Sequence, residues 1–330
     1  MVGDAERIRA ITRAEVEAAA RRLAPHLRPT PLAASPALSD LLNAEIWLKL
    51  ETASEIACFK LRGALNALLA IDGPKSAVTS STGNHGQAVA LAARRLGIPA
   101  DIFLPANPNP VKAGMIRLLG ATLHLGGADI DEAKDRARAH AARTGGTFVD
   151  DGENLDLIAG AGTLGLEIAT ALAGIDAVYV PMGSGSLVGG TAVGLKSVQP
   201  GLRVVAVQAT GSPAMVESFR ARRAVERPIA TLADCLVCRV PAEAALATML
   251  AALDDARLVT DEELFAAMHT YIARAHVLVE LGASAPLAGA WAERERLKGK
   301  RVVLVVSGAN AVPEHVLRAL ATPPLGGAFA

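Results

Sequence analysis

Lys60 stands where the sequence could build a nucleophile. The alternation of Ile46, Leu48 and Leu50 with more polar residues predicts a half-buried strand before it. A helical period of apolar residues over 61–69 predicts an amphipathic helix after it. A cation at a helix N-terminus opposes the macrodipole, typically by a few tenths of a kcal/mol. An ordinary surface lysine is the common alternative, but this position favours a lysine that serves as nucleophile and base.

The predicted helix carries small residues on the same face as Lys60. Gly63, Ala64 and Ala67 follow it at helical spacing, which places them on one stripe of the helix. The stripe predicts that something flat can approach the lysine closely.

A polar loop comes next. Ser81-Thr82-Gly83-Asn84-His85-Gly86-Gln87 joins a strand predicted over 77–79 to a helix predicted over 84–97. Backbone N–H groups and hydroxyls at a helix N-terminus suit a carboxylate ligand, although an ordinary helix cap is the alternative. His85 need not bind a metal, because no second His or Cys stands at ligand spacing.

A glycine- and serine-rich loop, Met182 to Gly190, follows a strand predicted over 177–180 and opens a helix predicted over 187–198. Glycines let the backbone approach an anion, and N–H groups at a helix terminus cradle a phosphate. The loop lacks the GK[ST] of a Walker motif and follows G-x-G-x-x-G spacing only in part. Alone, it also fits a non-catalytic anion-binding module.

Two shorter motifs lie further along the chain. Ser307-Gly308-Ala309-Asn310 ends an apolar strand predicted over 301–306, at the edge where open α/β sheets place ligands. Cys235 and Cys238 form a single CxxC pair, which fits core or lining residues better than a zinc site. In a strand-like run their sulfurs would point to opposite faces.

These motifs resemble those of the serine/threonine dehydratase and serine racemase family, which are pyridoxal-phosphate (PLP) enzymes of fold type II. Cys58-Phe59-Lys60-Leu61-Arg62-Gly63-Ala64 is similar to the family's S-F-K-x-R-G-A segment. The polar loop is similar to S-S-G-N-H-x-Q, the Gly/Ser loop to G-G-G-G-L and the last motif to S-G-G-N. Ser54-Glu55-Ile56-Ala57-Cys58 departs from the family's Q-x-T-G-S, and we expect this departure to lie in the substrate pocket.

The resemblance implies a role for each matching residue: Lys60 carries PLP as a Schiff base, Asn84 bonds its ring oxygen and Ser307 faces its pyridine nitrogen. The residues implied to bind the cofactor are Phe59, Lys60, Asn84, Gly183, Ser184, Gly185, Ser186, Leu187, Glu280 and Ser307. Those implied to bind the substrate carboxylate are Ser81, Thr82, Gly83, Asn84 and His85, and those implied to be catalytic are Lys60 and Thr82.

Strands and helices alternate along the chain, which predicts an α/β fold with parallel sheets. The resemblance implies two open twisted sheets with flanking helices, as in the β subunit of tryptophan synthase, with PLP between a small and a large domain. We expect residues 53–152 to form the small domain, and residues 1–52 and 153–330 to form the two parts of the large domain.

The N-terminal region has its own pattern. A helix predicted over 4–27 has a capping box at Thr12 and Glu15. Four prolines between 25 and 36 then predict no regular structure until a short helix near 36–43.

Composition argues against several classes of function. Lys+Arg and Asp+Glu number 33 each among 330 residues, so no charge excess indicates a nucleic acid or an anionic membrane. Three cysteines cannot form a disulfide framework, and we see no signal peptide or long apolar span. We expect a cytoplasmic homodimer or higher homo-oligomer whose partner is a small amino acid substrate, with no nucleic acid or membrane partner.

The resulting prediction is a PLP-dependent ammonia-lyase (dehydratase) that converts a β-hydroxy amino acid such as L-threonine or L-serine to a 2-oxo acid and ammonia. A dehydratase for a bulkier substrate such as phenylserine or 3-hydroxyaspartate, or a serine racemase, stays open. We expect no metal, because metal-activated members have a glutamate where this chain has the neutral Gln208, a poor ligand for a hard cation.

Overall fold

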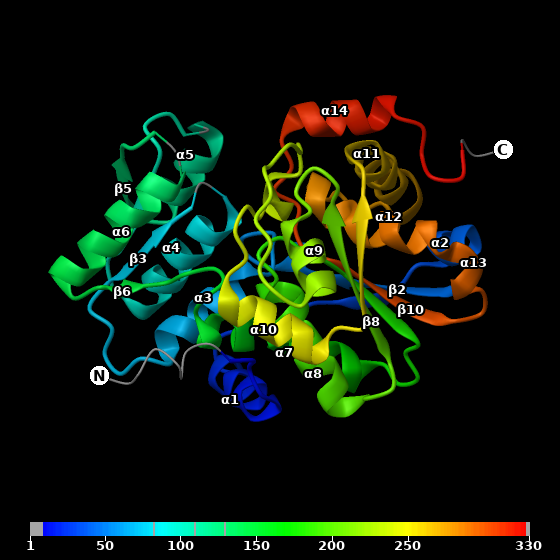
Figure 1. The fold of residues 1–330 in the computed structure, drawn as a ribbon, viewed down its shortest axis with the longest axis horizontal. Coiled ribbons are helices and arrows are strands. Elements are labelled where there is room, and N and C mark those ends of the chain that lie inside the picture. The colour runs from blue at the N-terminus through cyan, green and yellow to red at the C-terminus, as the bar shows by residue number, and fades with distance from the viewer. Residues whose placement is uncertain (1–8, 82, 109, 129, 328–330) are drawn as a thin grey trace.

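The computed structural model describes residues 9–81, 83–108, 110–128 and 130–327. It contains two sheets with helices on their faces, which confirms the predicted α/β class (Figure 1). The larger sheet has the strand order β1-β2-β10-β7-β8-β9, and the smaller has the order β5-β4-β3-β6. β1 pairs antiparallel with β2, and the other strand pairs in the described chain are parallel.

The chain begins in the larger sheet, leaves it to build the smaller one, and then returns. The strands of the larger sheet are β1 (Leu32–Ala34), β2 (Glu45–Leu50), β7 (Ala177–Pro181), β8 (Arg203–Ala209), β9 (Asp255–Val259) and β10 (Arg301–Val306). Those of the smaller sheet are β3 (Ala77–Ser80), β4 (Ala100–Leu104), β5 (Thr122–Leu125) and β6 (Thr147–Phe148). The predicted boundaries of the small domain at 53 and 152 enclose the smaller sheet and stay a prediction.

Helices cover both sheets. In Figure 1 the smaller sheet lies on the left with α4 (Asn84–Leu96), α5 (Pro110–Leu118) and α6 (Ile130–Thr144). One face of the larger sheet packs against α7 (Leu155–Ala171), α8 (Ser186–Val198), α9 (Ala214–Ala221) and α10 (Glu243–Ala252). The other packs against α2 (Pro36–Leu42), α11 (Asp261–Thr270), α12 (Ala285–Ala292), α13 (Arg294–Leu297) and α14 (Pro313–Ala321). Two further helices, α1 (Arg13–Leu23) and α3 (Lys60–Leu69), pack on α7.

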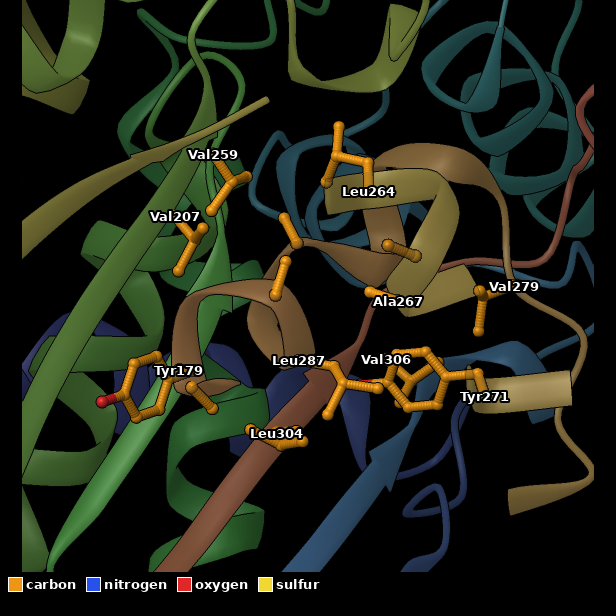
Figure 2. Packing of buried hydrophobic residues seen from close by; sticks show 14 of the residues in the cluster. Tyr179, Val207, Val259, Leu264, Ala267, Tyr271, Val279, Leu287, Leu304 and Val306 are labelled. Carbon is orange, nitrogen blue, oxygen red and sulfur yellow. The ribbon is translucent and has the colours of Figure 1, made fainter. Parts of the chain in front are cut away.

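The central position of β10 in the larger sheet explains why residues 301–306 are nearly all apolar. Val302, Leu304 and Val306 pack toward α11 and α12, and Figure 2 shows Leu304 and Val306 in this cluster. Val303 and Val305 belong to the cluster on the other face. A parallel strand covered by helices on both faces needs apolar side chains at successive positions, not at alternate ones.

The N-terminal predictions were confirmed in part. The Thr12 hydroxyl accepts a hydrogen bond from the Glu15 backbone N–H, and the Glu15 carboxylate accepts one from the Thr12 backbone N–H, which is the predicted capping box. The helix itself begins at Arg13. The absence of structure predicted for the proline-rich stretch was wrong, because β1 forms there. Pro31 lies just before an edge strand, where its missing N–H costs no ladder bond, and its carbonyl accepts from the Leu50 N–H.

A buried ion cluster ties α3 to the larger sheet. The Arg62 guanidinium lies 2.8 Å from Glu51 Oε2 and 2.6 Å from Glu167 Oε1, and its side chain is only 5% exposed. Lys49 Nζ lies 2.5 Å from Glu167 Oε2 and donates to the Thr30 carbonyl. Because these partners come from β2, its following turn and α7, the cluster fixes the N-terminal turn of α3.

We expect Arg62→Met to lower the free energy of unfolding by about 3–5 kcal/mol, because it leaves buried carboxylates without their guanidinium partner. The exposed Arg21 on α1 is the matched control, and urea denaturation followed by circular dichroism measures both variants. Equal midpoints for Arg62→Met and Arg21→Met would show that the cluster contributes no stability.

This loss should depend on pH. Burial raises the pKa of Glu51, but Arg62 outweighs burial and holds that pKa below its ordinary value. The contribution is therefore present above the unfolded pKa of about 4.3 and is lost as the pH falls through the lower folded pKa. The difference between wild type and Arg62→Met should narrow in acid.

Candidate active site

One cavity of about 340 Å³ lies at the carboxyl ends of strands from both sheets. Ser81 follows β3, Asp151 follows β6, Ser184 follows β7 and Ser307 follows β10, and all four line it. Lys60 lines it from the start of α3. The structure therefore brings together segments that lie far apart in the sequence.

Lys60 is held by pairing between its own segment and the end of β10. The Phe59 N–H donates to the Ser307 carbonyl at 3.0 Å, and Cys58 forms a β-bridge with Gly308. The Phe59 ring centroid lies 5.0 Å from Lys60 Nζ. The predicted neighbourhood of Phe59, Lys60 and Ser307 is thus present, and backbone hydrogen bonds account for it.

The segment before Lys60 turns through an unusual backbone conformation. Ala57 has φ of 52°, a left-handed value that costs roughly 1–2 kcal/mol for a residue with a Cβ. Ser54 supports the turn, because its hydroxyl donates to the Cys58 carbonyl at 2.7 Å and accepts from the Cys58 N–H at 2.9 Å. This chain thus accommodates alanine where the similar family has glycine.

We expected residues 54–58 to lie in the substrate pocket, and that expectation was wrong. Ser54, Glu55 and Cys58 line a separate cavity of about 300 Å³ and not the one that Lys60 faces. Phe59 lines both cavities. The turn at Ala57 therefore directs the departure from the family pattern away from Lys60.

The small-residue stripe after Lys60 serves helix packing. A Cβ on Gly63 would lie 2.8 Å from the Leu157 carbonyl oxygen in α7, and one on Gly160 would lie 2.6 Å from the Arg62 carbonyl oxygen. Gly63, Ala64 and Ala67 do not line the cavity. The prediction that the stripe admits a flat group was therefore wrong.

Among the lining residues that sequence reasoning missed, Asp151 lies in direct contact with Lys60. Its Oδ2 accepts a hydrogen bond from Lys60 Nζ, and its Oδ1 accepts one from the Ser186 hydroxyl at 3.4 Å. Burial raises the pKa of Asp151, but the neighbouring Lys60, His85 and Ser186 outweigh burial and leave the pKa lowered. The sequence could have indicated Asp151, because Asp150-Asp151 follows a predicted strand and parallel sheets place ligands at the carboxyl ends of their strands.

The Gly/Ser loop forms the N-terminus of α8. Gly185 caps the helix with φ of 93°, and a Cβ there would lie 2.5 Å from Met215 Cε and 2.6 Å from Met249 Sδ. Only glycine fits this position. The hydroxyls of Ser184 and Ser186 lie 3.1 Å apart at the cavity wall. A helix N-terminus with neighbouring hydroxyls suits a phosphate.

The polar loop follows β3 of the smaller sheet. It lines the cavity with Ser81, Gly83, Asn84 and His85. Thr82, also predicted here, lies outside the described residues. His85 Nε2 lies 3.0 Å from the Val149 carbonyl, so this nitrogen carries the proton. Burial lowers the pKa of His85, which keeps the ring neutral. Its Nδ1 is then a hydrogen-bond acceptor and cannot bind a carboxylate, which is also an acceptor. The hydroxyl and N–H groups of the loop are donors and can.

Asn84 is fixed from two sides. Its amide donates to Glu280 Oε1 at 2.8 Å, and its carbonyl oxygen accepts from Asn310 Nδ2 at 2.7 Å. Asn84 begins α4 beside the smaller sheet, whereas Glu280 and Asn310 belong to segments that flank β10. These hydrogen bonds join the two sheets' ends across the cavity.

Cys235 and Cys238 belong to no group of three or more metal-ligand side chains among the described residues. Cys235 lines the cavity and Cys238 is buried, as predicted, but Asp234–Leu236 forms a 3-10 turn and not the expected strand-like run. Burial raises the pKa of Cys238 to about 12, which keeps it a thiol.

One cluster of ligand-type side chains lies between the smaller sheet and α6. Ligand atoms of Asp101, His124 and His140 lie within 4.8 Å of one another. Arg143 donates to His140 Nδ1 at 3.2 Å, so His140 Nε2 carries its proton toward Asp101. His124 Nε2 lies 2.6 Å from Asp101 Oδ1, so the three side chains partner one another. Gln208 is buried and bonds the Leu236 carbonyl and the Val216 N–H, and the expectation of no metal stays a prediction.

The cavity's own residues fit PLP. It holds a lysine amine and the N-terminus of α8, where Gly185 takes a positive φ that glycine adopts readily. Two buried polar atoms in its wall, Ser80 Oγ and His85 Nδ1, have no hydrogen-bond partner among the described residues. Buried polar groups in native proteins are normally satisfied, so these atoms indicate that a ligand completes the site.

Comparison with known sequences places the chain in a class. The profile of the family described as "Pyridoxal-phosphate dependent enzyme" matches residues 23–308. The chain therefore belongs to this family and is a PLP-dependent enzyme of fold type II. In the described part of the chain, no helix is long and apolar enough to cross a membrane.

Individual relatives narrow the class to serine/threonine dehydratases and racemases. The chain is 36% identical over 306 residues to an L-threonine ammonia-lyase of Thermotoga maritima, covering 91% of this chain and 76% of the relative. It is 32% identical over 303 residues to an L-threo-3-hydroxyaspartate ammonia-lyase of Saccharomyces cerevisiae, covering 91% and 93%. The structure of maize serine racemase matches with a TM-score of 0.87 at 26% identity, covering 94% and 97%.

We expect Gly185→Asp to weaken PLP retention, because its side chain would collide with Met215 and Met249 and would repel a phosphate that carries about −1.5 to −2 charges. Gly201→Asp is the matched control, since nothing lies within 4 Å of a Cβ there. PLP content after dialysis measures the effect. Equal retention by both variants would argue against this loop as the phosphate site.

Proposed function

We propose that this protein is an ammonia-lyase that converts L-threonine or L-serine to the 2-oxo acid and ammonia. The observation that carries the proposal is that Lys60, the polar loop and the Gly/Ser loop line a single cavity. The similarity to an L-threonine ammonia-lyase supports the substrate class.

The residues of the cavity have distinct proposed roles. Lys60 would hold PLP, which when bound supplies an electron sink for the charge that develops at the substrate Cα. Once the substrate amine has displaced Lys60 from PLP, the freed Nζ would take the Cα proton, and Ser81 and Gly83, just before α4, would orient the substrate carboxylate. The backbone N–H groups of Gly185 and Ser186 at the start of α8 would hold the phosphate, while the Ser186 hydroxyl donates to Asp151. The β-hydroxyl leaves with a proton as water, and hydrolysis of the resulting unsaturated amine, through its imine form, gives the 2-oxo acid and ammonia.

Ser307 and Asn84 are proposed to contact the ring of the cofactor. Ser307 follows β10 and lines the cavity wall. A hydroxyl there leaves a pyridine nitrogen largely neutral, which favours proton removal with β-elimination over transamination. Asn84 is already oriented by Glu280 and Asn310. Glu280 would therefore position Asn84.

We further propose that residues 53–152 form a small domain and that the protein works in the cytoplasm as a homodimer or higher homo-oligomer. The smaller sheet within residues 77–148 supports the domain boundaries. A serine racemase stays open as an alternative activity, since the maize enzyme shares the fold.

Lys60→Ala should abolish covalent attachment of PLP and release of keto acid from L-threonine while leaving the fold intact, because alanine at a helix start costs little. Borohydride treatment followed by peptide mass mapping locates the modified lysine, and far-ultraviolet circular dichroism checks the fold. Lys75→Ala is the matched control outside the cavity. A borohydride-fixed adduct on any other lysine would overturn the assignment.

Elimination should exceed racemisation by at least about tenfold, because racemisation needs a second proton donor on the face opposite Lys60. In similar racemases a serine at the position of Thr82 donates that proton, and threonine's β-branching stiffens χ1 there. A donor displaced by about 1 Å can cost on the order of a hundredfold in rate. Chiral chromatography of residual L-serine during turnover measures the ratio. Thr82→Ser should raise D-serine formation, and D-serine accumulating as fast as keto acid in the wild type would make the chain a racemase.

A further inference from the structure

The charges around the cavity are unbalanced. Among the described residues that line it, Lys60 is the cation, and Asp151, Asp234 and Glu280 are the carboxylic acids. Glu280 accepts a hydrogen bond from Asn84. Asp151 differs from the other two acids because its carboxylate contacts the amine of Lys60 directly.

The contact with Lys60 places Asp151 close to any reacting substrate. If Lys60 removes the Cα proton, the substrate Cα must lie next to Nζ. Cβ is one bond from Cα, and its substituents are two bonds away. A carboxylate that contacts Nζ is therefore within reach of the group that distinguishes one β-hydroxy amino acid from another.

The orientation of Asp151 is fixed. Its two oxygens are held by different elements, Oδ2 by Lys60 at the start of α3 and Oδ1 by Ser186 at the start of α8. The neighbouring Asp150 turns the other way, since its Oδ2 lies 2.8 Å from Lys134 and 3.2 Å from Arg138 on α6. Of these two adjacent acids, Asp151 alone lines the cavity.

We propose that Asp151 is a specificity-determining residue, which admits substrates with a neutral, hydroxyl-bearing side chain and rejects those with an anionic side chain such as 3-hydroxyaspartate. This inference rests on the proposed function. An ionised carboxylate accepts a hydrogen bond from a hydroxyl and repels a second carboxylate. At the short separation that this cavity imposes, such repulsion weakens binding on the order of a hundredfold.

The first test compares substrates. The holoenzyme should show a kcat/KM for L-threonine at least about a hundredfold above that for L-threo-3-hydroxyaspartate, and Asp151→Asn should reduce this ratio at least about tenfold, mainly through KM for hydroxyaspartate. Asp150→Asn, the matched control, should keep the wild-type ratio. If Asp151 only partners Lys60, Asp151→Asn will change both substrates equally and the proposal is wrong.

The second test needs no turnover. Isothermal titration calorimetry of the holoenzyme compares succinate with butyrate, two acids of equal length that differ by one carboxylate. Asp151→Asn should tighten succinate binding at least about tenfold while leaving butyrate within about twofold. Unchanged succinate binding would overturn the proposal.

The two tests separate this inference from the proposed function. Absence of keto acid from every β-hydroxy amino acid, with the succinate effect intact, would refute the ammonia-lyase activity and leave the charge selection of Asp151 standing. Rapid turnover of L-threonine with equal turnover of hydroxyaspartate by the wild type would refute the selection and leave the activity standing.

Discussion

The buried guanidinium of Arg62 is the interaction on which the site depends. Lys60 and Arg62 share the first turn of α3, so whatever fixes one fixes the other. Two carboxylates, Glu51 and Glu167, hold Arg62 from β2's end and from α7. An ion cluster is a costly way to join elements in the interior, since desolvation offsets much of the attraction. Its geometry is directional, however, and apolar contacts alone would not set the position of a lysine amine so narrowly.

The second constraint is the direction of the strands. Parallel strands end at one edge, and the helices that follow them begin there with unpaired N–H groups. Two such edges face one cavity in this fold, so α4 and α8 both present their N-termini to it. The anion affinity of the site thus follows from the topology. Lys60 supplies the positive charge, and Asp151 limits which anions the cavity accepts.

The chain departs from the family pattern at positions where the local backbone accommodates the replaced residue. Ala57 takes a left-handed conformation that Ser54 supports through two hydrogen bonds. Ser184 and Ser186 replace glycines in the loop without a positive φ, whereas Gly185 between them needs one. Glycine is therefore replaced where the backbone stays in a region open to residues with a Cβ, as at Ser184 and Ser186, or where local hydrogen bonds support a left-handed residue, as at Ala57.

The sequence by itself determined the elements and most of the candidate site. Two patterns predicted strands. The alternation before Lys60 reflects burial on one face, and the continuous apolar run Arg301–Val306 reflects burial on both faces. Such patterns are local properties of the sequence. Contacts between distant segments decided the rest. Only the folded chain shows that the residues before Lys60 face a second cavity and that Gly63 faces α7. Only the meeting of β6's end with α3 and α8 brings Asp151 to Lys60, because 91 positions separate them in the chain and no period links them.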